Sequence, residues 1–237
     1  MIEVIAFDGD DTLWHSEQLF VDTQAAFREL LAPYVDLDDA TLDARLVEVE
    51  TRNLPTFGYG VKAFTLSLLE TAIEVTDGAI PGQALRSILE LGKVLLDHPV
   101  QLLDGVPEAI DALTDRYRVM VVTKGDLLHQ ESKVARSGLA ELFWQVEIVS
   151  EKDEASYRRL LERWRIDPAT FVMVGNSVRS DVLPVLAIGG RAVHVPYHVT
   201  WVLEHAEPDP ERHDFPVLGS MAELPDCIAT LDSSTDA

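Results

Sequence analysis

The sequence predicts an α/β protein: a doubly wound, mainly parallel sheet of the Rossmann type with an inserted bundle of α-helices. Three observations predict this class. Residues 16–97 carry apolar side chains at three- and four-residue steps, which is the period of amphipathic helices. After residue 99, short apolar runs alternate with helical patterns, as is typical of parallel sheets. Residues 2–7 form a further apolar run, separated from the others by the helical block.

Four helices are expected in the helical block. The apolar positions predict them over residues 19–34, 42–49, 64–73 and 85–95. Pro81 shortly precedes the last of them, and proline favours a helix start. Four such helices can bury their apolar faces against one another in a small bundle.

Four strands are expected after the block. They are runs rich in Val, Ile, Met and Phe at residues 118–122, 146–149, 171–174 and 192–195. Helices between these runs are predicted to begin near Pro107, Asp126, Asp153 and Ser180.

The run at residues 2–7 has no strand neighbour before the helical block, so it most simply joins the later sheet. The helical block is then an insertion into the α/β core. We expect a discontinuous core formed by residues 1–14 and 101–237, and a helical cap formed by residues 15–100.

Composition excludes several classes of protein. The chain has 19 Lys and Arg residues against 41 Asp and Glu, a net charge of −22, which repels nucleic acids and anionic membranes. No apolar segment approaches the length that spans a bilayer. Cys227 is the only cysteine, so no internal disulfide can form. We therefore expect a cytoplasmic protein with neither nucleic acid nor membrane as its partner.

Polar residues follow the predicted strands at the edge where open α/β sheets bind ligands. Asp8 and Asp10 come directly after residues 2–7, and burying such carboxylates without partners costs several kcal/mol. Taken alone, these acids would equally fit a solvated turn. Thr123, Lys152 and Asn176 stand at or just after later strand ends, however, and together they indicate a site.

In this order, the residues resemble the motifs of the haloacid dehalogenase-like hydrolase superfamily, specifically its phosphatases with a helical cap after the first motif. Residues 8–13 resemble the first motif, Thr123 the second, Lys152 the third, and residues 175–177 with Asp181 the fourth. Four spaced motifs are far more specific than one.

The resemblance implies a phosphatase that works through an aspartyl-phosphate intermediate. Asp8 would be the nucleophile, because a carboxylate is ionised at neutral pH and its acyl phosphate is readily hydrolysed. Asp10 would be the general acid and base. This assignment predicts opposite environments, with Asp8 kept charged beside a cation and Asp10 having the higher pKa.

The resemblance also implies Mg²⁺, because phosphoryl transfer gathers charge on oxygens that a hard cation neutralises. Asp8 and Asp181 would hold it, together with the backbone carbonyl of Asp10. Asn176 stands where many family members have aspartate, and we expect it to orient a metal-bound water.

Phosphate binding is expected from Thr123, Lys124 and Lys152, through a hydroxyl group and two positive charges. Lys124 stands where an asparagine is common in the family. In the cap, Tyr59 and Lys62 lie in or beside a glycine-flanked loop. Substrate contact by these two residues is one interpretation, and an ordinary turn between helices is the other.

Three other functions stay open at this point. A 2-haloacid dehalogenase would use Asp8 to displace halide, and it would need neither an acid at Asp10 nor magnesium. A phosphotransferase would pass the phosphoryl group to a second hydroxyl. A non-catalytic protein of this fold would only bind a phosphorylated ligand. For the leading function, the expected partner is a small phosphorylated metabolite, and the expected state is a monomer or homodimer.

Overall fold

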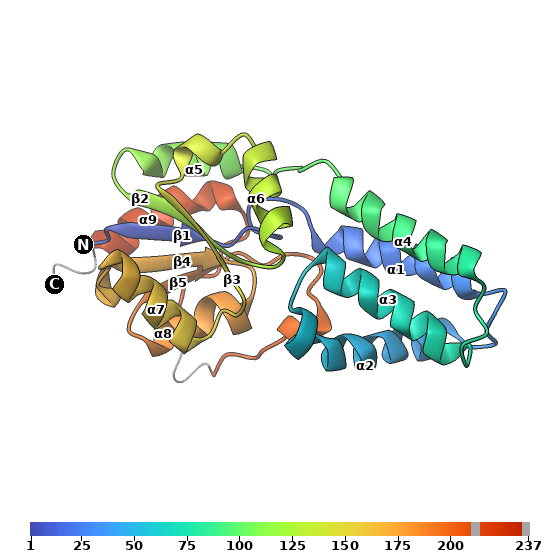
Figure 1. Ribbon diagram of the computed structural model, residues 1–237. Helices are drawn as coiled ribbons and strands as arrows, with labels where there is room; N and C mark the ends of the chain where they lie inside the picture. The colour runs from blue at the N-terminus through green and yellow to red at the C-terminus, as the bar shows by residue number, and fades with distance from the viewer. Residues whose placement is uncertain (210–213, 234–237) are drawn as a thin grey trace. The chain divides into compact units, whose positions relative to one another are not determined.

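The structure, a computed structural model, describes residues 1–209 and 214–233 (Figure 1). Chain contacts divide it into two compact units. The first holds residues 1–17, 100–124 and, from residue 130, the rest of the described chain, and the second holds residues 18–99 and 125–129.

A five-stranded sheet forms the centre of the first unit, and each pair of neighbouring strands is parallel. This confirms the predicted doubly wound class. The order across the sheet is β3-β2-β1-β4-β5. The strands are β1 (Val4–Phe7), β2 (Arg118–Lys124), β3 (Gln145–Val149), β4 (Phe171–Gly175) and β5 (Arg191–His194).

The first strand of the chain lies in the middle of this sheet. Phe7 is level with Val121 of β2 on one side and with Val174 of β4 on the other. The first apolar run therefore joins the later sheet, as predicted. All four residues of β1 are buried, which explains why this strand is apolar throughout rather than alternating.

Helices cover both faces of the sheet (Figure 1). Because side chains alternate along a strand, Ile5 and Phe7 join one core cluster and Val4 and Ala6 join the other. The first cluster includes residues of α5 (Val106–Thr114), α6 (Leu127–Arg136) and α9 (Leu224–Ser233), and the second includes residues of α7 (Glu154–Trp164) and α8 (Leu183–Ala187).

The helix predicted to begin near Ser180 begins earlier in the structure. The Ser177 hydroxyl caps it, accepting a hydrogen bond from the backbone N–H of Ser180 at 3.1 Å. Val178–Val182 then form one π-helical turn before α8. Such widened turns are frequent at functional sites, and this one carries Asp181, whose exposed fraction is 0%.

The second unit consists mainly of four helices, in the block where four were predicted. They pack around a core that includes Phe27, Leu46, Leu68 and Ile88. The helices are α1 (Glu17–Leu31), α2 (Asp39–Phe57), α3 (Val61–Val75) and α4 (Gly82–Asp97).

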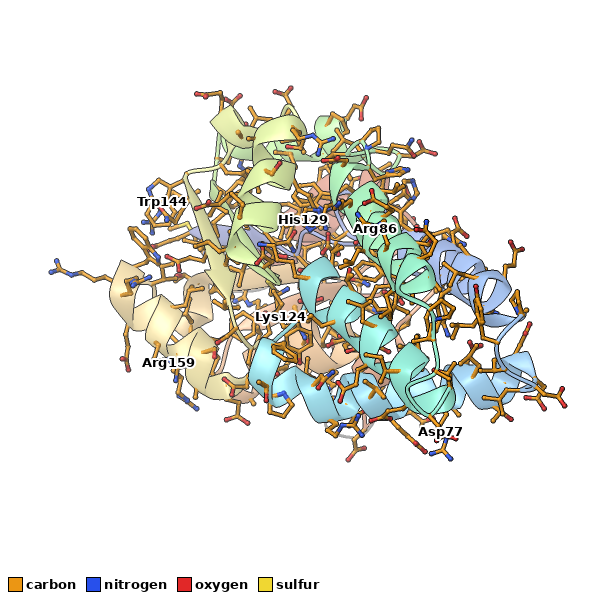
Figure 2. The ribbon with its side chains drawn as sticks, turned by 45° about the vertical axis from the view of Figure 1, so that its right-hand side comes forward. Asp77, Arg86, Lys124, His129, Trp144 and Arg159 are labelled. Atoms are coloured by element: carbon orange, nitrogen blue, oxygen red, sulfur yellow. The ribbon has the colours of Figure 1, made fainter. Side chains whose placement is uncertain are left out.

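A five-residue segment that follows β2 also belongs to the helical unit. Within it, Asp126 accepts hydrogen bonds from Lys62 Nζ at 3.0 Å and from the N–H of His129, which is labelled in Figure 2, at 3.1 Å. Tyr59 lies in the turn between α2 and α3. Substrate contact by Tyr59 and Lys62 stays a prediction. Across the described residues, no helix combines the length and the apolar character that crossing a bilayer requires.

Candidate functional site

The centre of the site is the end of β1, flanked by the ends of β2 and β4. Asp8 directly follows β1, and its backbone N–H donates to the carbonyl of Val174 at 2.9 Å. Thr123 and Lys124 are the last residues of β2, and Asn176 directly follows β4. Parallel pairing therefore places these sequence-predicted residues at one edge of the sheet.

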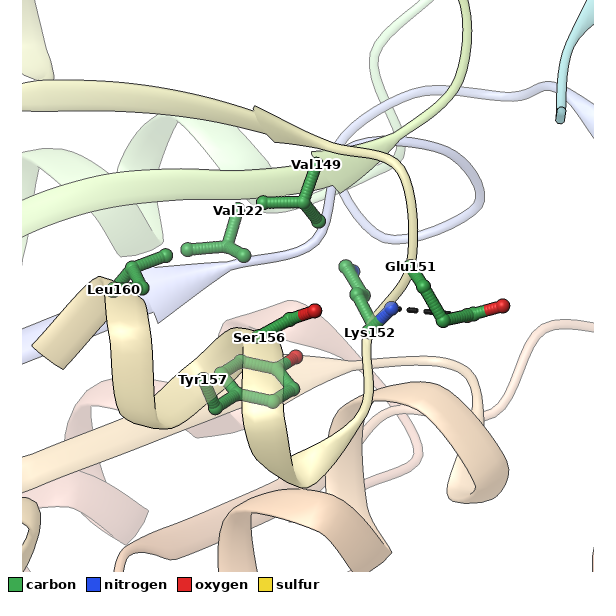
Figure 3. A pocket seen from close by; sticks show the side chains of 7 residues that line it. All are labelled: Val122, Val149, Glu151, Lys152, Ser156, Tyr157 and Leu160. Carbon is green, nitrogen blue, oxygen red and sulfur yellow. Dashed lines mark hydrogen bonds between the residues drawn. The ribbon is translucent and has the colours of Figure 1, made fainter.

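Lys152 joins two of the predicted carboxylates. Its Nζ lies 2.5 Å from Asp8 Oδ1 and 2.7 Å from Asp181 Oδ1, and only 3% of the residue is exposed. Figure 3 shows Lys152 on the loop after β3, where its backbone N–H donates to Glu151. Asp153 then caps α7 by accepting from the N–H of Ser156. The cap anchors the loop that carries Lys152.

Burial is the largest single influence on the pKa values of Asp8 and Lys152. It raises the pKa of Asp8 to about 7, against the opposing effect of Lys152 and with a further increase from Asp181. Burial alone would lower the Lys152 pKa, but the charges of Asp181 and Asp8 outweigh it and raise that pKa. The lysine therefore stays charged between two carboxylates.

Asp10 is held by three side-chain donors. Its Oδ1 accepts from Trp14 Nε1 at 2.7 Å and Lys133 Nζ at 2.6 Å, and its Oδ2 accepts from Gln130 Nε2 at 3.0 Å. Burial would raise the Asp10 pKa, but Lys133 and the other donors lower it below its ordinary value. We predicted a higher pKa for Asp10 than for Asp8, and the protein's own groups produce the opposite order. The reason is Lys133, whose contact with Asp10 was not predicted from the sequence.

Thr123 and Asp10 share one donor. Gln130 Nε2 lies 3.0 Å from Thr123 Oγ1 and 2.6 Å from the Lys124 carbonyl, so it bridges the end of β2 to Asp10. The backbone of Gly9 lies close to Trp14 and Thr123. A Cβ atom on Gly9 would lie 2.8 Å from the Trp14 ring and 3.2 Å from Thr123 Oγ1, which explains the need for glycine at that position.

Lys124, labelled in Figure 2, ends β2 beside the fourth-motif turn. Its Nζ lies 2.9 Å from Ser180 Oγ and 2.5 Å from Glu204 Oε1. Glu151 Oε1 lies 3.6 Å away. Lys124, which we expected to bind phosphate, is therefore paired with Glu204.

Asp181 occupies a closely fitted position. Its Oδ2 accepts from the N–H of Ser177 at 2.9 Å, while Lys152 donates to its Oδ1. A Cβ atom on Gly175 would lie 2.2 Å from Asp181 Oδ2, so only glycine leaves room for this carboxylate. The side chain of Asp181 thus contacts both Lys152 and the backbone of Ser177, the residue that caps the turn.

Oxygens gather around the side chain of Asn176. The amide atom that faces them lies 3.1 Å from Asp8 Oδ2 and 3.2 Å from both the Asp10 carbonyl and Thr12 Oγ1. The amide nitrogen faces these oxygens and donates to all three. The oxygens of Asp8 and Asp10 are of the kind that suits Mg²⁺.

Among the residues that the structure describes, no three His, Cys, Asp or Glu side chains gather as a metal site by themselves. A cation here would depend on the Asp10 carbonyl as well as on carboxylates. These donors still fit Mg²⁺, which is commonly held by one or two carboxylates.

Asp11, to which the sequence assigned no role, shapes the entry to α1. Its φ of 61° is unusual for a residue other than glycine. Its carboxylate accepts from the backbone N–H groups of Ser16 at 2.8 Å and Glu17 at 3.0 Å. These bonds satisfy donors at the helix start, in the manner of an N-cap.

Sequence reasoning missed four residues that contact the predicted ones. Gln130 and Lys133 carried a usable signal, since they are three residues apart on the helix after Thr123 and so share one face. Trp14 also had a signal, as a close neighbour of Asp10 in the sequence. Glu204 had none, because it lies in a short 3₁₀ turn outside any periodic pattern.

Comparison with known proteins adds family evidence to this geometry. The family model described as haloacid dehalogenase-like hydrolase matches residues 2–189. A haloacid dehalogenase-like family hydrolase from Xanthomonas campestris is 42% identical, with a TM-score of 0.88, and the match covers 99% of this chain and 94% of that one. No curated protein matches the chain.

Two further solved structures carry different activities in their descriptions. A 2-haloacid dehalogenase from Pseudomonas syringae pv. tomato is 26% identical, with a TM-score of 0.65 and coverage of 97% and 99%. A protein from Haemophilus somnus, described as a predicted phosphoglycolate phosphatase, is 15% identical, with a TM-score of 0.62 and coverage of 95% and 97%. The second likeness shows the fold alone.

Proposed function

Because the chain belongs to the haloacid dehalogenase-like hydrolase family, we propose that it is a magnesium-dependent phosphatase acting on a small phosphomonoester through an aspartyl-phosphate intermediate. One observation carries the proposal: a second carboxylate, Asp10, is held in place two residues after Asp8. An ester that leaves as an alkoxide needs a proton donor, whereas a leaving halide does not.

In the first step, Asp8 would attack phosphorus. A bond forms between its carboxylate oxygen and phosphorus, the bond from phosphorus to the ester oxygen breaks, and Asp10 gives its proton to the leaving oxygen. In the second step, water attacks the same phosphorus and Asp10 takes a proton from it. The bond from phosphorus to Asp8 then breaks, releasing inorganic phosphate and restoring both carboxyl groups.

The low pKa of Asp10 sets a condition on this role. The proposal requires the bound phosphate ester to raise the Asp10 pKa, as a nearby like charge does. For Asp8, a bound dication would lower the pKa from about 7 and favour the ionised nucleophile. Bound ligand and bound metal together would then give Asp10 a higher pKa than Asp8, as predicted.

Positive charge and hydroxyl donors would stabilise the phosphoryl group. Lys152 is buried against Asp8 and would stabilise charge that develops next to the nucleophile. Thr123, at the end of β2, would donate its hydroxyl to a phosphate oxygen. Lys124 would contribute to phosphate binding from the same strand end, with its charge partly offset by Glu204.

Mg²⁺ would be held by Asp8, Asp181 and the Asp10 carbonyl, and Asn176 would orient a metal-bound water. The Asp8 carboxylate and the Asp10 carbonyl both lie beside the Asn176 amide, which supports this assignment. When bound, the ion would supply positive charge that neutralises the phosphoryl oxygens. Asn176 in place of a carboxylate makes the site less negative, so we expect weaker metal binding than with aspartate at that position.

The test is phosphate release from para-nitrophenyl phosphate and from an alkyl phosphate, each with and without Mg²⁺. We expect Asp8→Asn to reduce release to the rate without enzyme, and Asp111→Asn, the same change at an exposed position, to leave it intact. Asp10→Asn is expected to lower kcat by roughly 100-fold or more on the alkyl phosphate, but less on the aryl ester, whose leaving group needs little protonation. Equal rates for wild type and Asp8→Asn would contradict the mechanism.

The second candidate is a 2-haloacid dehalogenase, which the likeness to the Pseudomonas syringae enzyme favours. Asp8 would then displace halide from carbon, and water would hydrolyse the resulting ester. Halide release from 2-chloropropionate without added metal, together with no phosphate release, would place this function ahead of the phosphatase.

A further inference from the structure

Glu204 lies at the centre of a buried polar cluster beyond the last strand of the sheet. It ends the 3₁₀ turn Val202–Glu204. Its carboxylate accepts from Lys124 Nζ at 2.5 Å, Ser180 Oγ at 2.5 Å and Ser177 Oγ at 2.7 Å. Arg179 anchors the same turn by donating to the carbonyl of Leu203.

These contacts join the two strand ends on either side of the nucleophile. Lys124 ends β2, and Ser177 and Ser180 belong to the turn after β4. Since β2 and β4 both pair with β1, a side chain bonded to both flanking segments bridges the edge at which Asp8 lies. We call this set of contacts the Glu204 clamp.

The clamp is well matched in charge and largely shielded from water. The side chain of Glu204 is 15% exposed, and that of Lys124 is 12% exposed. Burial acts to raise the Glu204 pKa, but Lys124 and the serine hydroxyls outweigh it and lower that pKa, so the carboxylate is charged at neutral pH. Charge-assisted bonds of this kind are shorter and stronger than neutral ones.

We propose that Glu204 is a positioning residue, which fixes the spacing between the phosphate-binding end of β2 and the turn that carries Asp181. The kinetic part of this inference rests on the proposed phosphatase function. Glu204 lies outside the stretch, residues 2–189, that the family model matches, so the clamp adds to what the family motifs supply. Thr123 precedes Lys124, and Asp181 follows Ser180, so a displaced clamp residue would move its catalytic neighbour directly.

Hydrogen exchange of the full-length protein tests the clamp without relying on activity. We expect Glu204→Ala to speed exchange of the backbone amides in residues 177–182 and 202–205, and Lys124→Met to do so in 202–205. Glu207→Gln, the loss of an exposed carboxylate three residues away, should leave both segments unchanged. Unchanged exchange in Glu204→Ala would overturn the clamp.

Kinetics with the phosphate esters test positioning. We expect Glu204→Ala to lower kcat by roughly 10- to 100-fold, because small displacements of reacting groups are costly. Glu204→Gln, which keeps one acceptor oxygen, should recover part of that loss. Unchanged kcat with faster exchange would show a purely structural role and overturn the positioning claim. If the wild type releases no phosphate, the proposed function fails, while the exchange result still decides whether the clamp exists.

Discussion

Lys133 Nζ lies 2.6 Å from Asp10 Oδ1, so the proposed proton donor is paired with a lysine of α6. Gln130 of the same helix bonds the other carboxylate oxygen. One helix thereby sets both the orientation and the charge of Asp10. This helix directly follows the second-motif strand, so a shift of α6 would alter Thr123 and Asp10 together.

Replacing Lys133 tests how much this pairing contributes to turnover. We expect Lys133→Met to lower kcat for an alkyl phosphate by roughly 10- to 100-fold, because the loss of the partner that orients Asp10 outweighs the rise of its pKa. Steady-state kinetics would measure the change. Lys93→Met, at a lysine with 64% side-chain exposure, is the matched control and should leave kcat unchanged. An equal loss of kcat in both variants would show that the loss does not come from the orientation of Asp10.

Adding one methyl group at Gly175 should disable the site. In Gly175→Ala the new Cβ would lie 2.2 Å from Asp181 Oδ2, so the carboxylate that Lys152 contacts must be displaced. We expect a loss of kcat and weaker dependence on added Mg²⁺, measured by magnesium titration of phosphate release. Gly82→Ala has no neighbouring atom within 4 Å and provides the control. Full activity of Gly175→Ala would mean that Asp181 is not needed where it stands.

The two helix caps allow stability to be separated from activity. Asp38 and Asp153 each accept a hydrogen bond from the N–H three residues on, at the starts of α2 and α7. We expect the alanine variant of each to lower the free energy of unfolding, measured by urea denaturation. Only Asp153→Ala should also lower kcat, since Lys152 precedes it. Equal kinetics in the two variants would contradict a role for the α7 cap in holding Lys152.

The Glu204 clamp predicts a dependence of stability on pH. The folded-state pKa of Glu204 lies below its ordinary value of 4.5, so its contribution is complete above that value and disappears as pH falls through the folded pKa. We therefore expect the stability difference between wild type and Glu204→Gln to be largest near neutral pH and to shrink below pH 4.5. Urea denaturation across this range would measure it. A stability difference that grows as the pH falls would contradict a lowered pKa for Glu204 in the folded protein.

The sequence could predict which elements meet at the site, because parallel strands place their carboxyl ends together. Asp8, Thr123, Lys152 and Asp181 are brought to one edge for this reason. It could not predict the pKa order of the acids, since that depends on Lys133 reaching Asp10 from another element. The pairing of Lys124 with Glu204 could not be predicted either, because Glu204 lies in an irregular segment without a periodic sequence pattern.

The central place of β1 also bears on how the chain folds as it is made. Among the described residues β1 pairs with β2 and β4, and residues 4–7 are made long before residues 171–174. At about 5–20 residues per second, the full pairing waits roughly 10 to 30 seconds. The four helices of the second unit, encoded between these strands, are complete much earlier. The sheet around Asp8 is therefore completed only late in synthesis, when β4 has been made.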